Sequence, residues 1–263
     1  MTPVALTIAG SDPSGGAGIQ ADLKTFHQHR VYGEAVVTLL TVQNTRGVTR
    51  VECLDPVLVA EQIAAVLSDI PPGAAKTGAL GNAGVVEAVA ASIGATPLVV
   101  DPVMISKHGA ALIDEDAAAA LKTLLLPRAL LLTPNLHEAA ALTGIEVVTK
   151  EAMIEAGLRL LDYGPVAVLI KGGHLDGRAA DVLVTRDSIT WFDGDRVSTP
   201  HTHGTGCTYS AAITARLASG EALVDAVRGA KAFIAEAIRT NPGLGHGHGP
   251  VNHFVASLHP LPR

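Results

Sequence analysis

The sequence contains few aromatic residues and no cluster of basic residues. Aromatic side chains make up 3% of its 263 residues, too few for the stacking platforms of single-strand nucleic-acid binders. The formal net charge is −6, so the basic footprint that duplex binding requires is missing as well. We therefore expect no nucleic-acid partner.

Long apolar runs and cysteines are also scarce. The longest apolar runs, such as residues 129–132, are far too short to cross a bilayer, and residues 1–9 lack the basic start of a signal peptide. The two cysteines, Cys53 and Cys207, are expected to be free thiols in a reducing compartment. These features predict a cytoplasmic protein without a membrane partner.

Hydrophobic residues make up 48% of the chain, and strand-like segments alternate with helix-like ones. The length suits a single α/β domain, which we place at residues 1–263. Continuous apolar strands without polar alternation indicate a mostly parallel sheet covered on both faces. The expected central strands are residues 4–9, 35–41, 97–100, 129–133 and 166–170, followed by a strand pair at 181–185 and 188–192. Asp114 can cap a helix through Leu126, and a helix from Thr205 to about 239 should break near Gly220.

Polar side chains follow several of these strands. Asp12, Asp101, Asn135 and Lys171 each come just after a strand-like run. Ligands of open α/β sheets bind outside the carboxyl ends of the strands, so one cleft is expected to collect these side chains.

Two glycine-containing loops precede helices. Residues 10–18 read Gly-Ser-Asp-Pro-Ser-Gly-Gly-Ala-Gly, which matches neither a Walker motif nor the dinucleotide fingerprint. In the second loop, Gly204, Thr205 and Gly206 can present successive backbone N–H groups at a helix start. We expect this nest to hold the transferring phosphoryl group.

Cys207 follows the nest, in the first helical turn. A helix N-terminus favours the thiolate, so its pKa is expected to fall, and the thiolate could act as a general base. The alternative is a buried structural cysteine, the interpretation we adopt for Cys53.

Asn135 and Glu138 lie three residues apart at a helix start. They can form a capping box, or Glu138 can join Asp101 in holding Mg²⁺ through water. Lys171, followed by Gly172 and Gly173, fits either a phosphate contact or a surface turn.

Taken together, these segments resemble the ribokinase superfamily, and within it the hydroxymethylpyrimidine/phosphomethylpyrimidine kinases of thiamine biosynthesis. The resemblance covers essentially the whole chain. The matching segments are residues 9–25, 42–45, 76–78, 101–104, 133–135, 171–174, 201–207 and 245–253.

The resemblance implies an α/β/α sandwich with a central, mostly parallel sheet. It also implies two successive ATP- and Mg²⁺-dependent phosphorylations of 4-amino-5-hydroxymethyl-2-methylpyrimidine, and a homodimer. The family's pyrimidine contacts fall on Gln43 and Asp22, with Gly10 and Val103 lining the pocket. Its nucleotide and metal positions fall on Asn135, Glu138, Lys171 and Thr185. The family carries cysteine where most related sugar kinases carry an aspartate base, and Cys207 matches that position.

Two positions depart from the family pattern. Ala79 stands where many relatives have methionine, and residues 107–109 are bulkier than the Ser-Gly-containing stretch of relatives. Both bear on substrate detail more than on reaction class.

Several alternatives remain open from the sequence alone. A pyridoxal kinase of the same superfamily shares the hydroxymethyl acceptor on a nitrogen ring, although Gln43 favours the aminopyrimidine. A sugar kinase would normally keep the aspartate base. A catalytically silent pyrimidine or nucleotide sensor could share the fold. His246, His248 and His253 could in principle bind a metal, although a packed or flexible tail is the commoner use of such a segment.

Overall fold

The computed structural model describes residues 2–104, 113–173 and 179–256. In these ranges a nine-stranded sheet has the order β3-β2-β1-β4-β5-β6-β7-β8-β9. The strands are β1 (Val4–Ser11), β2 (Tyr32–Asn44), β3 (Gly47–Cys53), β4 (Ala74–Thr77), β5 (Leu98–Val100), β6 (Leu131–Leu132), β7 (Ala167–Ile170), β8 (Asp181–Thr185) and β9 (Ile189–Phe192). The helices are α1 (Gly18–Gln28), α2 (Pro56–Asp69), α3 (Ala83–Ser92), α4 (Glu115–Ala120), α5 (Leu136–Thr143), α6 (Lys150–Leu161), α7 (Thr205–Ala218) and α8 (Leu223–Arg239).

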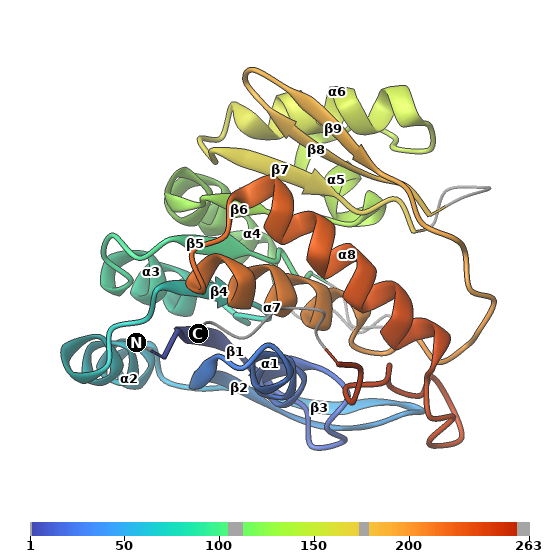
Figure 1. The fold of residues 1–263 in the computed structure, drawn as a ribbon. Coiled ribbons are helices and arrows are strands. Elements are labelled where there is room, and N and C mark those ends of the chain that lie inside the picture. The colour runs from blue at the N-terminus through green and yellow to red at the C-terminus, as the bar shows by residue number, and fades with distance from the viewer. Residues whose placement is uncertain (1, 105–112, 174–178, 257–263) are drawn as a thin grey trace.

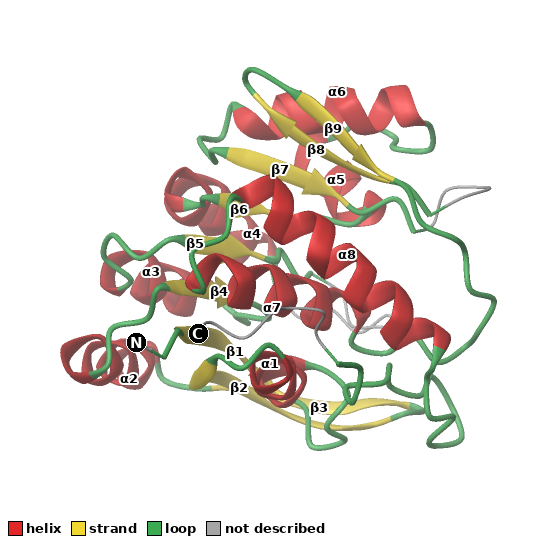
Figure 2. Ribbon diagram, in the orientation of Figure 1, coloured by secondary structure: helices red, strands yellow, loops and turns green. Residues whose placement is uncertain are grey.

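The sheet is parallel through its centre and antiparallel at its edges. Strands β2, β1, β4, β5, β6 and β7 run parallel, whereas β3, β8 and β9 join antiparallel. Helices α1, α7 and α8 cover one face, and α2 to α6 cover the other (Figures 1 and 2). The predicted three-layer sandwich with a mostly parallel sheet is therefore confirmed.

The helix boundaries follow local chemistry. Asp55 caps α2, accepting a hydrogen bond from the Val57 N–H at 2.8 Å, with Pro56 in the first turn. The helix expected from Asp114 to Leu126 is not one continuous α-helix, because a π-helical turn (Leu121–Leu125) and a 3₁₀ turn (Leu126–Arg128) follow α4.

The long C-terminal helix breaks as predicted. Gly220 adopts a positive φ of 87° between α7 and α8, a conformation that ends a helix at little cost in glycine. In the described ranges, none of the helices combines the length and apolarity that a membrane span needs.

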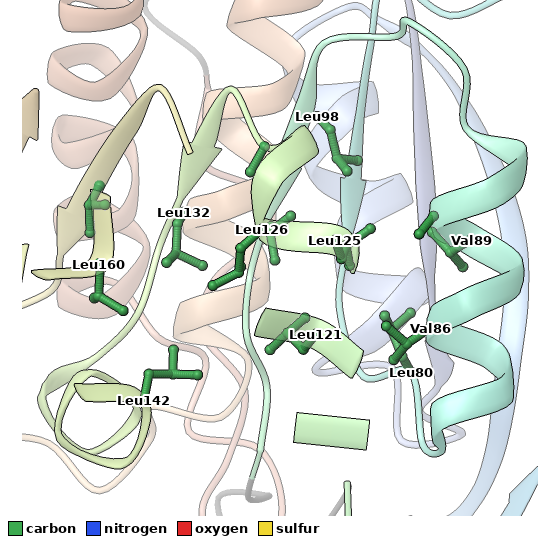
Figure 3. Close-up of a cluster of buried hydrophobic side chains, with 14 of the residues drawn as sticks. Leu80, Val86, Val89, Leu98, Leu121, Leu125, Leu126, Leu132, Leu142 and Leu160 are labelled. Carbon is green, nitrogen blue, oxygen red and sulfur yellow. The ribbon is translucent and has the colours of Figure 1, made fainter. Parts of the chain in front are cut away.

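The larger hydrophobic cluster lies between the sheet and helices α2 to α6. Figure 3 shows leucine and valine side chains from this cluster meeting between the strands and the helices. Leu98 of β5 and Leu132 of β6 are completely buried there. Because aromatics are scarce, branched aliphatic side chains fill this layer and hold the strand ends in register.

Replacing Leu98 by alanine should lower the free energy of unfolding by about 2–5 kcal/mol, because the fully buried side chain leaves a cavity. Urea unfolding measures the change. Leu158→Ala is the matched control, since that side chain on α6 is 47% exposed and its loss should change stability by roughly 0.5 kcal/mol or less. Equal losses in both variants would contradict this assignment of the core.

Candidate active site

A cavity of about 580 Å³ opens at the carboxyl ends of the parallel strands. Its walls come from the loop after β1, the outer part of β2, the ends of β5, β6 and β7, and the start of α7. Most of the predicted site residues line it: Gly10, Gln43, Asp101, Val103, Asn135, Glu138, Lys171, Gly204, Thr205, Gly206 and Cys207. Ala79, one of the two departures from the family pattern, also lines the cavity.

Asp22 does not reach this cavity, which corrects the expectation that it contacts the pyrimidine. Its side chain is completely buried on α1. Its Oδ2 accepts hydrogen bonds from Thr7 Oγ1 at 2.6 Å and from Lys76 Nζ at 2.9 Å. Asp22 is therefore an ion-pair partner beneath the cavity rather than part of its wall.

The predicted nucleotide contact of Thr185 does not fit the structure either. Strand β8 runs antiparallel to β7, and Thr185 pairs with Ala167 at the beginning of β7. Lys171 follows the opposite end of that strand, on the order of 13 Å away at the usual rise per residue. The Thr185 hydroxyl instead bonds to Ser188, so this residue lies at the wrong edge of the sheet for nucleotide binding.

The two glycine loops pack directly against each other. Gly204 adopts a positive φ of 77°, and a side chain at this position would collide with the carbonyl oxygen of Gly16. Asp12 of the first loop joins the two loops. Its Oδ2 lies 2.8 Å from His203 Nε2 of the second loop and also accepts a hydrogen bond from the Ala17 N–H at 2.8 Å. Burial alone would raise the pKa of Asp12, but hydrogen bonds with His203 and Ser14 bring it below the ordinary value.

Two lysines, one completely buried and one largely buried, lie near the start of α7. Lys76 on β4 is completely buried and pairs with Asp22. Lys171 Nζ lies 2.9 Å from Asp101 Oδ1, and a side-chain carbon at Gly206 would lie 3.4 Å from the same Nζ atom. Burial would lower both lysine pKa values, but the partner carboxylates raise them above the ordinary value. Positive charge is thus held next to the nest.

Cys207 differs from the prediction in its protonation. Burial raises the pKa of its thiol to about 11, and the neighbouring Lys76 charge offsets only part of that rise. The expectation of a lowered pKa is therefore wrong, because it considered the helix N-terminus and not the loss of hydration. The thiol still lines the cavity directly after the nest, and both Cys207 and Cys53 are free.

Both interpretations of Asn135 and Glu138 fit the structure. Asn135 Oδ1 accepts from the Glu138 N–H at 2.9 Å, and Glu138 Oε2 accepts from the Asn135 N–H at 2.8 Å, forming a capping box at α5. Both residues also line the cavity. Burial raises the pKa of Glu138 to about 7, and the charge of Lys171 works against that rise.

The histidines of the tail contact other protein groups. His248 Nδ1 lies 3.1 Å from the carbonyl oxygen of Pro200, and His253 Nε2 lies 3.1 Å from Thr208 Oγ1. Across residues 2–104, 113–173 and 179–256, no three histidine, cysteine or acidic side chains group as metal ligands would. Residues 107–109 and His174 lie outside the described residues.

Three site residues were not assigned roles from the sequence. Lys76 could have been noticed because a charged residue interrupts the apolar strand β4, and fully buried lysines require a partner. The contact between Asp12 and His203 joins residues 191 positions apart. No local pattern indicates such a pair.

Comparison with known proteins agrees with this geometry. The sequence model of the family described as phosphomethylpyrimidine kinase matches residues 12–252. A hydroxymethylpyrimidine/phosphomethylpyrimidine kinase from Synechococcus elongatus is 47% identical over 262 residues, covering 96% of this chain and 97% of that protein.

Two solved structures share the fold. Phosphomethylpyrimidine kinase from Clostridium difficile superposes with a TM-score of 0.80 at 43% identity, covering 90% of this chain and 100% of that one. An ADP complex of Bacillus subtilis pyridoxal kinase gives a TM-score of 0.89 at 39% identity, covering 96% and 98%. The family match, the identity over nearly the whole length and the shared fold show that this chain belongs to the phosphomethylpyrimidine kinase family.

Proposed function

We propose that this protein transfers the γ-phosphate of ATP to the hydroxymethyl group of 4-amino-5-hydroxymethyl-2-methylpyrimidine and then phosphorylates the monophosphate, in thiamine biosynthesis. The observation that carries the proposal is one cavity that joins an anion nest, a cysteine beside it and an amide on the opposite wall. Membership of the family supports the same reaction.

The pyrimidine occupies the end of the cavity formed by β1 and β2. Gln43 supplies an amide that both donates and accepts hydrogen bonds, as an aminopyrimidine edge requires. Leu39, Val48 and Val103 give this end an apolar wall, and the absence of a side chain at Gly10 leaves room for Leu39 in that wall. The acceptor hydroxyl then faces the nest.

The phosphates occupy the other end of the cavity. The backbone N–H groups of Gly204, Thr205 and Gly206 stabilise the charge of the transferring phosphoryl group. Lys171 holds a phosphate from beneath, and Asn135 contacts the nucleotide at the start of α5. The ADP bound in the structurally similar Bacillus subtilis pyridoxal kinase supports a nucleotide in this fold.

Asp101 and Glu138 fit a magnesium ion bound mainly through water. Both carboxylates line the cavity, and Mg²⁺ in kinases usually takes one or two protein carboxylates besides phosphates and water. When bound, the ion supplies positive charge that neutralises the phosphates. The carboxylates orient its water ligands.

Cys207 is positioned to take the proton of the acceptor hydroxyl. Only the thiolate can accept this proton. The Lys76 charge beneath it favours that form, in opposition to burial. We also propose that the protein forms a homodimer and acts in the cytoplasm.

Pyridoxal is a second candidate substrate, since a pyridoxal kinase shares this fold at 39% identity. The protein should be incubated with ATP and Mg²⁺ and with each ring compound in turn. The hydroxymethylpyrimidine should give its mono- and diphosphate, identified by mass spectrometry. Omission of Mg²⁺ should abolish both products. Pyridoxal phosphate alone would move the assignment to vitamin B6, and no product from either would favour a silent sensor.

Cys207→Ala should lower kcat by roughly 10²–10⁴-fold, the usual weight of a positioned base. Because the thiol pKa is about 11, wild-type kcat should rise as pH increases above neutral, and the variant should lose that rise. Cys53→Ala is the control, since Cys53 is outside the residues that line the cavity. Wild-type turnover in Cys207→Ala would remove this thiol from the mechanism.

Glu138→Gln should raise the Mg²⁺ concentration for half-maximal activity by about 10- to 100-fold, the usual cost of losing a group that orients metal ligands. The amide oxygen can still accept the Asn135 N–H, so the thermal unfolding midpoint should change little. Glu151→Gln, on the exposed first turn of α6, is the matched control. An unchanged Mg²⁺ requirement would exclude Glu138 from the metal site.

A further inference from the structure

The glycine- and histidine-rich segment of residues 245–250, here called the Gly-His loop, packs on the turn between β2 and β3. Thr45 in that turn receives three backbone N–H groups from the loop. The Thr45 hydroxyl accepts from His246 at 3.2 Å and from Gly247 at 3.3 Å, and the Thr45 carbonyl accepts from His248 at 2.8 Å. The loop is therefore held to the hairpin by its backbone.

The composition of the loop follows from this close packing. A side-chain carbon at Gly247 would overlap the carbonyl oxygen of Thr45 and meet the backbone of Arg46. Any other residue would push the loop away from the turn. Gly245 and Gly247 thus allow the loop to approach Thr45 closely.

The same loop is attached to the phosphate end of the site. The carbonyl of Gly249 accepts the His203 N–H at 3.0 Å, and the Val251 N–H donates to the His203 carbonyl at 3.3 Å. Pro250 and His203 form a parallel bridge. Since Gly204 comes next in the chain, the loop is fixed directly beside the nest.

The hairpin needs such an attachment. Strand β2 pairs with β1 only as far as Leu40, and beyond it the strand pairs with β3 alone. Two-stranded hairpins are weakly stable on their own. Gln43 lies on this outer arm, two residues before Thr45, and Figure 1 shows the red C-terminal segment beside the end of the blue hairpin.

We propose that the Gly-His loop is a positioning element that sets the location of Gln43 relative to the Gly204–Gly206 nest. It links the ring-binding arm at Thr45 to the phosphoryl-transfer end at His203. Thr45 and Gly247 act through Gln43 and touch no reacting atom. The inference rests on the proposed function for the identity of the ring, and on the contacts above for the link itself.

Thr45→Val tests the proposal, because it removes the hydroxyl acceptor and keeps the branched shape. We expect the KM for the hydroxymethylpyrimidine to rise about 5- to 30-fold, the range expected for one or two broken hydrogen bonds. The KM for ATP should stay within about twofold, since ATP does not contact the arm. Amide hydrogen exchange of residues 43–48 should become faster in the same variant.

Two further variants separate positioning from general packing. Thr45→Ser keeps the hydroxyl and should restore both the KM and the exchange rates. Gly243→Asn changes a glycine just before the loop, with a positive φ of 65°, where an added side-chain carbon would meet no other segment within 4 Å. Asparagine tolerates this backbone conformation, so this control should behave like the wild type.

An unchanged KM for the pyrimidine in a folded Thr45→Val protein would overturn the proposal, even if exchange becomes faster. A wild-type protein that phosphorylates no pyrimidine would defeat the proposed function instead. In that event, the amide exchange rates of residues 43–48 still test the link between loop and arm. Exchange that is unchanged in Thr45→Val would overturn that link.

Discussion

The proposed phosphoryl-transfer site depends on paired positive charge next to the Gly204–Gly206 nest. Lys76 is completely buried and Lys171 largely so, which is tolerated because Asp22 and Asp101 lie 2.9 Å from their ammonium groups. Each pair fixes one lysine at the end of a parallel strand, next to the start of α7. In the proposed function, a phosphoryl group entering the cavity meets charge and backbone dipoles that are already oriented.

Several groups serve the fold and the site at once. Glu138 caps α5 through the Asn135 N–H and also lines the cavity. Asp12 holds the first glycine loop through its backbone N–H groups and ties that loop to His203. Parallel sheets bring strand ends and helix starts together. Side chains that accept hydrogen bonds from the unpaired backbone N–H groups there therefore also lie at the cavity.

The fold and most of the cavity wall could be predicted from the sequence, because continuous apolar strands and the polar residues after them are local signals. The misplacement of Thr185 came from the direction of β8, which its own residues do not encode. The errors at Asp22 and Cys207 came from burial, since the loss of hydration depends on the packing of distant segments. The link between the Gly-His loop and Thr45 was likewise invisible in the local sequence, where glycine and histidine indicate a tail.

The contacts that complete the site join opposite ends of the chain. Asp12 meets His203 across 191 positions, and Thr45 meets His246 across 201. Contacts of such separation form late, because a long loop must close before they can stabilise anything. The outer arm of β2 and β3 is synthesised long before residues 245–250, so Thr45 meets its backbone partners only after that segment has left the ribosome. A nascent chain that ends before this segment therefore lacks the contacts that hold the hairpin to the residues beside Gly204.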